Sequence, residues 1–418
     1  MSAAPQAPEP LLADERRAAP ICVARQPIFD RDLAVFGYEL LFRRLGAEEA
    51  DVRDSEEATS RTLLGSLIEI GLESLVGDTL ALINVSDEFV LAGHAELAPK
   101  ERVALELLEI ANPTPELVSR LRELTVSGYT LALDDFVYDP AREPLLELAH
   151  IVKLDVQATP VERLRRSIEA LSPVGVALVA EKIEDYATYE QCRALGFDYF
   201  QGRFLCHPRT LSAAPIPADR LNQLQLAALL RDPEVELAQL ERVIARDLGL
   251  SYRLLRYINS AHFALRRRIE SIREAVVLLG LRTVKTFATV LALAHIDDTP
   301  SELLVTALVR ARMCELIAEA RRDNPDVAFT VGLFSLVDAI VDRPLEQILD
   351  SLPLSPEIGE ALLTGGGRYG RTLAAVIAHE RGRFADSARL APNIELGGAY
   401  LRAVAWATEA QQTLVDAA

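Results

Sequence analysis

Acidic and amide side chains recur within short apolar runs in the first half of the chain. Examples are YELLF, VALELLE and LALDD, in which polar residues interrupt or close sequence that otherwise favours β-strands. Buried carboxylates need a compensating charge, and carboxylates with one amide oxygen suit Mg²⁺ or Mn²⁺ rather than zinc. Two such cations would support hydrolysis of a phosphodiester by an activated water. The candidate ligands are Glu39, Asn84, Glu106, Asp134 and Asp135.

A second set of polar residues follows the same pattern in the later runs. Lys153 and Asp155 lie in VKLD, Glu181 ends VALVAE, and Gln201 follows YF. Because side chains alternate along a strand, Lys153 and Asp155 share one strand face. Lys153 as a simple ion-pair partner of Asp155 is therefore an alternative to a catalytic lysine.

Each acid also has a simpler interpretation, because a single carboxylate at a strand end is more often solvated or caps the next helix. Glu184 and Asp185 fit that interpretation, since they open a helical stretch. The case for a site depends on the recurrence of polar residues over seven of eight predicted strands. Solvated strand ends do not predict such a recurrence.

The elements that would position these residues alternate between short β-rich runs and amphipathic helical stretches. Gly128 and Gly196 stand where two of the helices should end. Eight strands within about 190 residues favour a closed, largely parallel (βα)8 barrel of the TIM type, with ligands at the C-terminal ends of the strands. The predicted strands begin at Ile21, Val35, Thr79, Arg102, Thr130, Ile151, Gly175 and Tyr199.

A proline-bearing stretch, SAAPIPA from Ser212, separates this half from a second half with a different pattern. Strand signals almost vanish after it, and the sequence reads as successive helices, which predicts an all-α domain. We expect a disordered N-terminal segment at residues 1–19, a barrel at 20–208 and a helical domain at 209–418.

Composition limits the classes of function. The 418 residues carry a formal net charge of −18, which argues against general nucleic-acid binding but not against a small anion in a locally positive pocket. The four cysteines form no CxxC pair, as expected of reduced thiols. We find no signal peptide and no apolar run long enough for a membrane span, so we expect a cytoplasmic protein.

In this order, the polar residues form motifs that resemble the EAL family of cyclic-di-GMP phosphodiesterases over about residues 20–208. Leu40 stands where that family usually has Ala or Val. Eight motifs in register make the resemblance specific. They are QPI at Gln26–Ile28, ExLxR at Glu39–Arg43, NxS at Asn84–Ser86, ExxE at Glu106–Glu109, DDF at Asp134–Phe136, KxD at Lys153–Asp155, ExxE at Glu181–Glu184 and QG at Gln201–Gly202.

The resemblance implies roles for these residues in cleaving cyclic-di-GMP to the linear dinucleotide pGpG. Lys153 and Glu181 would position or activate the attacking water, with support from Gln201. Gln26 and Arg43 would contact the dinucleotide, since a guanidinium suits a bridging phosphate. The family's metal positions correspond to Glu39, Asn84, Glu106, Asp134 and Asp135.

One segment departs from the family. After DDF, active members usually carry a glycine-rich GxGYSS loop, whereas this chain has VYDPAR from Val137 to Arg142. That loop arranges the adjacent aspartates and mediates dimer contacts, and this sequence lacks its glycine freedom. Three functions stay open: a regulated phosphodiesterase, a cyclic-di-GMP receptor without turnover, and a protein-interaction scaffold. Homodimer formation is also open.

The second half resembles the HDOD module over about residues 213–390, a relative of HD-type metal phosphohydrolases that lacks their ligands. Ser335 and Leu336 stand where an HD enzyme would have its His-Asp pair. The resemblance is carried by ARDLGLSYRLLRYINSA from Ala245, IESIREAVVLLG from Ile269 and the stretch that begins GLFSL at Gly332. It implies protein interaction or signal relay, through an unidentified partner, rather than catalysis.

Other polar residues of this half have structural interpretations. The histidines His262, His295 and His379 are expected at the surface or in a satisfied core, because none is followed by Asp. Arg266–Arg268 form a solvated turn or a partner contact. Helix caps, helix contacts and core packing are the expected roles of Ser251, Asn259, Ser271 and Trp406.

Overall fold

A computed structural model describes residues 21–44, 71–108, 111–209, 218–232, 235–245, 248–259, 269–293 and 300–417. The predicted N-terminal segment at 1–19 lies outside these residues. So does the stretch at 210–217, which adjoins the predicted boundary between the two halves, and the division at 208/209 therefore stays a prediction.

The first half is a closed barrel in which the strands neighbour one another in chain order. All eight predicted strands are present and the predicted barrel is confirmed. The strands are β1 (Ile21–Phe29), β2 (Val35–Arg44), β3 (Leu80–Val85), β4 (Val103–Leu107), β5 (Thr130–Leu133), β6 (Ile151–Asp155), β7 (Ala177–Ile183) and β8 (Tyr199–Gly202).

The first strand runs against its neighbours. β1 pairs antiparallel with both β2 and β8, whereas all the pairs from β2 through β8 are parallel. Only five residues separate β1 from β2, too few for the crossover that parallel strands require, and Asp30 closes a turn with Leu33 and Ala34 instead. The hairpin places Gln26 of β1 opposite Glu39 of β2.

Helices cover the outside of the remaining strands. Thr114 and Asp185 cap two of them by accepting backbone N–H groups, and Gly128 and Gly196 follow their C-terminal ends with positive φ, as predicted. The helices are α2 (Leu72–Val76), α3 (Asp87–Leu91), α4 (Pro115–Val126), α5 (Glu143–Leu146), α6 (Val161–Leu171) and α7 (Tyr186–Leu195), with 3₁₀ turns η2 (Ala95–Leu97), η3 (Pro140–Arg142), η4 (Ser172–Val174) and η5 (Phe204–Cys206).

From Ala218 onward, every described element is a helix, which confirms the predicted all-α half. These helices are α8 (Ala218–Arg231), α9 (Leu237–Ala245), α10 (Leu248–Ile258), α11 (Ile272–Leu279), α12 (Leu281–Leu293), α13 (Ser301–Arg321), α14 (Pro325–Phe334), α15 (Val337–Val341), α16 (Leu345–Leu349), α17 (Pro356–Thr364), α18 (Gly367–Glu380), α19 (Phe384–Leu390) and α20 (Leu396–Ala417). None of the helices in the described ranges is both long and apolar enough to cross a membrane.

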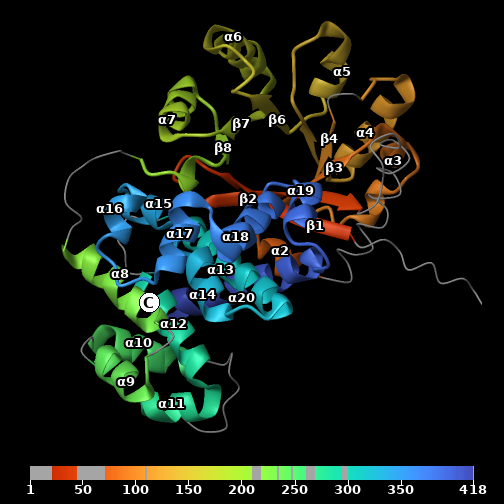
Figure 1. Ribbon diagram of the computed structural model, residues 1–418. Coiled ribbons are helices and arrows are strands. Elements are labelled where there is room, and N and C mark those ends of the chain that lie inside the picture. Colours follow the sequence, from red (N-terminus) through yellow and green to blue (C-terminus); the bar gives the residue numbers. More distant parts are fainter. Residues whose placement is uncertain are drawn as a thin grey trace, which may run out of the picture.

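The two halves share one hydrophobic core. The outer side of β1 is covered by α18 and α20. Figure 1 shows the barrel helices α4 to α7 on one side of the hairpin and the helices of the second half on the other. Val23 of β1 and Tyr400 of α20 belong to this shared core, whereas α9 to α12 build most of a second one.

Polar residues of the helical half have the predicted structural roles. Asn259 exchanges hydrogen bonds with the backbone of Ile269, and Ser271 caps α11. Ser251 donates to the Ile244 carbonyl, and Trp406 packs edge-on against Phe329. His379 is a fully buried core residue, as predicted; its Nε2 donates to the Val23 carbonyl, whereas its Nδ1 has no hydrogen-bond partner among the described residues. The predictions for His262, His295 and Arg266–Arg268 fall outside the described residues.

Candidate functional site

The predicted polar residues form the next layer of side chains above the apolar interior of the barrel. That interior is built from Ile28, Leu82, Ala104, Ala132, Ile151 and Val179. Two positions further along each strand, the alternation of side chains brings another residue into the barrel. Those residues are Asn84, Glu106, Asp134, Lys153 and Glu181, and, because β1 runs the opposite way, Gln26 precedes Ile28 by two.

Lys153 occupies the centre of this layer. Its Nζ lies 3.0 Å from Glu39 Oε2, 2.5 Å from Glu181 Oε1 and 3.4 Å from Asp134 Oδ1, and it also contacts Glu106. Its side chain is almost completely buried. One ammonium is therefore shared by four carboxylates from four different strands or strand ends.

The alternative that pairs Lys153 with Asp155 is wrong. Asp155 lies at the end of β6, where its carboxylate accepts the backbone N–H groups of Gln157 and Ala158 and pairs with Lys182 at 2.7 Å. The two residues share a strand face as predicted, but Asp155 belongs to the rim of the barrel and Lys153 to its interior.

Burial and charge set the protonation of this layer. Burial raises the pKa of Glu106 well above its usual range and that of Glu181 to about 8, with Lys153 opposing both shifts. Burial also disfavours ionised Glu39, but Lys153 and hydrogen bonds from Gln201 and Asn84 outweigh it, so the pKa of Glu39 is lowered. The four acids raise the pKa of Lys153 far above normal in spite of its burial.

The oxygen atoms of this layer fit divalent cations. Two sets of three carboxylates each bring ligand atoms within 4.8 Å of one another, namely Glu39, Glu106 and Glu181, and Asp134, Asp135 and Glu181. Among the described residues, Asn84 Oδ1, Glu106 Oε2 and Gln201 Oε1 are buried without a hydrogen-bond partner. Buried acceptors without donors are costly, and a hard cation with oxygen ligands would satisfy them.

The remaining predicted residues lie beside these acids. The Gln201 amide donates to Glu39 Oε2 at 2.7 Å and to Gln26 Oε1 at 3.1 Å, so it joins β8 to both strands of the hairpin. Arg43 lies in β2 opposite Cys22, but its side chain is outside the described part of the structure. Glu109, the last residue of one predicted motif, is outside it as well.

Two residues of the rim have unusual backbone conformations. Asp135 and Lys182 have φ values of 39° and 61°, which non-glycine residues rarely adopt. The Lys182 ammonium donates to both carboxylate oxygens of Asp135 at 3.1 Å. The β7–β8 pairing is irregular between Ala180 and Ile183, which turns Lys182 toward the rim. Conformations of this kind persist where the surroundings impose them, commonly at functional sites.

The segment that replaces the family's glycine-rich loop is ordered by its own residues. Asp139 caps the short η3 helix by accepting the N–H of Ala141. Val137 and Tyr138 are about half exposed and leave Asp135 without a glycine hinge beside it. The segment therefore has a short capped helix and no glycine next to Asp135.

Above the acidic layer, the mouth opens into a cavity of about 500 Å³ with basic residues at its rim. Arg203 follows β8 and pairs with Glu184 at 2.5 Å; the Glu184 side chain is partly solvated, and its neighbour Asp185 caps α7. Arg381 and Arg383 come from the turn between α18 and α19 in the helical half. These arginines and Lys182 were not predicted from the sequence. Lys182 lies within the ExxE motif at Glu181–Glu184 and Arg203 directly follows the QG motif, whereas Arg381 and Arg383 adjoin no motif.

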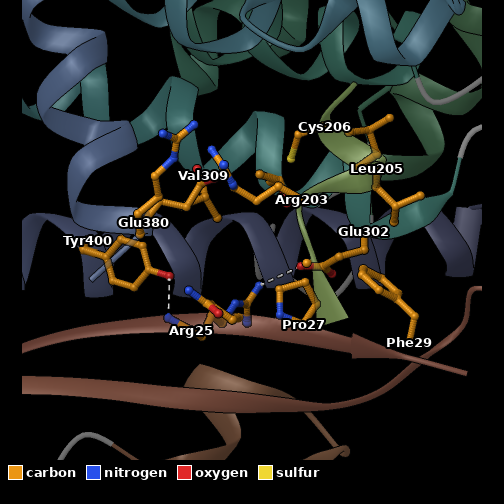
Figure 2. Close-up of a pocket in the computed structure, with 15 residues that line it drawn as sticks. Arg25, Pro27, Phe29, Arg203, Leu205, Cys206, Glu302, Val309, Glu380 and Tyr400 are labelled. Atoms are coloured by element: carbon orange, nitrogen blue, oxygen red, sulfur yellow. Dashed lines mark hydrogen bonds and ion pairs between the residues drawn. The ribbon is translucent and has the colours of Figure 1, made fainter. Parts of the chain in front are cut away.

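A smaller cavity of about 90 Å³ lies between the halves and is lined by Arg203 and Arg381 among others. In Figure 2, the Arg25 backbone donates to the Tyr400 hydroxyl, and the Arg25 guanidinium pairs with Glu302. Tyr38 donates to Glu302 Oε2 at 2.8 Å. A buried polar network thus connects the outer side of β1 and β2 to α13 and α20.

Comparison with known proteins agrees with both halves. The HDOD domain model matches residues 216–341. The uncharacterized protein YuxH of Bacillus subtilis is 32% identical over 92% of this chain and 98% of its own length. The cyclic di-GMP phosphodiesterase CdgJ of Vibrio cholerae is 33% identical over 84% of this chain and 83% of its own length. A solved EAL domain protein from Listeria monocytogenes has a TM-score of 0.37 and 21% identity, covering 45% of this chain and 88% of that one. The chain belongs to the EAL–HDOD family that includes YuxH and CdgJ.

Proposed function

We propose that the barrel mouth binds cyclic-di-GMP together with divalent cations, Mg²⁺ or Mn²⁺, and hydrolyses it to linear pGpG under the control of the HDOD half. The relative CdgJ, a cyclic di-GMP phosphodiesterase, supports this substrate. The observation that carries the proposal is the single polar layer inside the barrel, with buried oxygen atoms that have no partner among the described residues.

The carboxylates and the amide of this layer would hold the cations. The ligands we propose are Glu39, Asn84, Glu106, Asp134 and Asp135. Bound divalent cations supply charge stabilisation at a phosphoryl oxygen and lower the pKa of water. An all-oxygen set suits Mg²⁺ or Mn²⁺ better than a soft metal.

Other side chains orient the reactants. The Lys153 ammonium fixes the directions of Glu39, Glu106 and Glu181 by contacting all three. Glu181, 2.5 Å from Lys153, would accept a proton from the attacking water in its ionised form. Burial raises the pKa of its carboxyl to about 8, so this carboxylate is a stronger base than a solvated glutamate. Gln201 would support that water beside Glu39. Gln26 and Arg43 would contact the dinucleotide.

The test is to incubate the full chain with cyclic-di-GMP and Mg²⁺ or Mn²⁺ and to quantify pGpG by chromatography. Glu39→Ala should lower turnover by about 100-fold or more, because it removes a ligand and an acceptor for Lys153 and Gln201. The matched control is Glu116→Ala, an exposed acid on α4, which should leave turnover unchanged. Equal turnover in wild type and Glu39→Ala would contradict the proposal.

A receptor that binds cyclic-di-GMP without cleaving it is the second candidate. The VYDPAR segment favours it, because the Asp135 backbone lacks a neighbouring glycine hinge. Lys153 also supplies part of the charge compensation that cations would otherwise provide. Saturable nucleotide binding without pGpG formation in the same samples would select this function. If the chain neither binds the nucleotide nor forms pGpG, only the scaffold function remains.

The proposed location, protein partner and oligomeric state follow from the same family. We propose a cytoplasmic location, where an enzyme or receptor for this nucleotide would meet its ligand. The HDOD half would contact a protein partner, which is supported by the exposed side chains of Tyr252 on α10 and Val277 on α11. Homodimer formation is a further proposal, to be checked by light scattering.

A further inference from the structure

The cavity at the barrel mouth is lined by both halves of the chain. Its floor consists of the acidic layer, and part of its rim is the turn that joins α18 to α19, with Arg381, Gly382 and Arg383. None of the barrel motifs includes these arginines, which lie far beyond β8 in the sequence. The helical half therefore contributes side chains to the site where the nucleotide would bind.

The turn is held against the strand that carries the first metal-ligand candidate. Gly382 has a φ of 69°, and a Cβ atom at this position would lie 2.9 Å from Leu41 Cδ1. Leu41 lies two residues after Glu39 and two before Arg43 on β2. A side chain at this position would have to displace the Leu41 side chain, and the positive φ favours glycine.

The arginines of the turn lie among both basic and acidic neighbours, and Glu380 opposes the lowering of the Arg381 pKa. Arg381 Nε is buried and has no hydrogen-bond partner among the described residues. Burial first, and then the like charges of Arg203, Arg383 and Arg310, lower the pKa of Arg381. Arg383 is exposed and lies 3.8 Å from Asp386, one turn away on α19. The carboxylate next to the turn, Glu380, is already held by Arg310 through two hydrogen bonds of 2.7 Å.

The cavity at the mouth brings Arg203, Arg381 and Arg383 together above the acidic layer. Guanidinium groups bind phosphate oxygens through paired hydrogen bonds, and a group of them is stabilised when an anion joins it. The acidic floor attracts cations, and the basic rim attracts an anion. A cyclic dinucleotide has two phosphates, so one can lie over the floor while the other meets the rim.

We propose that Arg381 and Arg383 of the HDOD half form a phosphate-binding rim for the cyclic dinucleotide at the mouth of the barrel. This inference rests on the proposed function and adds two residues of the helical half to the nucleotide site of the barrel. The helical half completes the nucleotide site, so any movement of the α18–α19 turn away from Leu41 changes the affinity of the barrel. Nucleotide binding, in turn, holds the two halves together.

The test measures cyclic-di-GMP affinity of the full chain by calorimetry in the presence of Ca²⁺, with chromatography to verify that no pGpG forms. Arg381→Gln and Arg383→Gln should each weaken binding by about 5- to 20-fold, and the double variant should bind with a smaller dependence on salt concentration. The control is Arg371→Gln, an exposed arginine of α18 outside the cavity, which should bind as wild type does.

A second variant tests the position of the turn without changing a charge. Gly382→Val should weaken binding about as much as Arg381→Gln, because its side chain would push the turn from Leu41. Melting temperatures of all the variants establish that they are folded.

The outcomes separate the two proposals. Wild-type binding that is weakened by the rim variants and not by Arg371→Gln supports the inference. Wild-type binding with unchanged affinity in both rim variants overturns the inference and leaves the proposed function standing. Absence of wild-type binding overturns the proposed function, and the inference falls with it.

Discussion

Among the individual residues, Lys153 has the largest electrostatic role in the barrel. Its ammonium is buried and in contact with Glu39, Glu106, Asp134 and Glu181. Removing one partner from a buried ionic group leaves the others uncompensated, which is far more costly than breaking an ion pair on the surface. A single lysine thus makes a layer of acids compatible with a folded barrel before any cation binds.

Lys153→Met should therefore destabilise the protein strongly in the absence of metal. We expect the free energy of unfolding in EDTA to fall by about 3–5 kcal/mol, and Mn²⁺ to restore part of it because the cation binds only the folded carboxylate layer. Denaturant titrations with EDTA and with Mn²⁺ measure both effects. Lys100→Met, at an exposed lysine, is the control. A variant as stable as this control would contradict the role assigned to Lys153.

At the scale of the elements, alternation along the strands explains why so much of the site could be predicted. Polar residues such as Glu106 and Glu181 stand two positions beyond an inward apolar residue, and this spacing is visible in the sequence. The pairing of Lys153 with Asp155 failed as a prediction because a shared strand face does not specify depth in the barrel. Arg381 could not be predicted, since only tertiary packing brings its turn to the mouth.

The junction of β7 and β8 offers a test of how the strands position the site. Gly202 has a φ of 155°, and a Cβ atom there would overlap the Ile183 backbone. Gly202→Ala should lower the free energy of unfolding by about 2–4 kcal/mol and displace Gln201, whereas Gly359→Ala, in open space on α17, should be neutral or slightly stabilising. Thermal and denaturant unfolding measure the difference, and equal stabilities would contradict the packing described for this junction.

For the whole molecule, the helical half supplies part of the outer layer of the barrel. Its helices α18 and α20 pack on β1 of the hairpin. Cores that run through both halves favour cooperative unfolding. The composition shift at SAAPIPA predicted two patterns of secondary structure, but it contained no information about this shared core.

His379 makes this inter-domain packing dependent on pH. Its Nε2 donates to the Val23 carbonyl at 3.0 Å, and burial lowers the pKa of its imidazole from 6.5 to about 4. Between these values the unfolded chain binds a proton that the folded chain does not, so stability decreases as pH falls from 6.5 towards 4, by up to about 3 kcal/mol.

His379→Gln retains a donor for the Val23 carbonyl and removes the titrating ring. Denaturant titrations between pH 7 and 4 should therefore give a shallower loss of stability for this variant than for wild type. Parallel curves would contradict the assignment of this pH dependence to His379.

The central claim is that the polar layer of the barrel holds divalent cations next to a phosphate of the nucleotide. Anomalous scattering from crystals of the full chain grown with Mn²⁺ and cyclic-di-GMP measures this directly. We predict manganese peaks among Glu39, Asn84, Glu106, Asp134 and Asp135, with nucleotide phosphate density in contact with them. Nucleotide bound at the mouth without manganese in this layer, or manganese bound only elsewhere, would contradict the account.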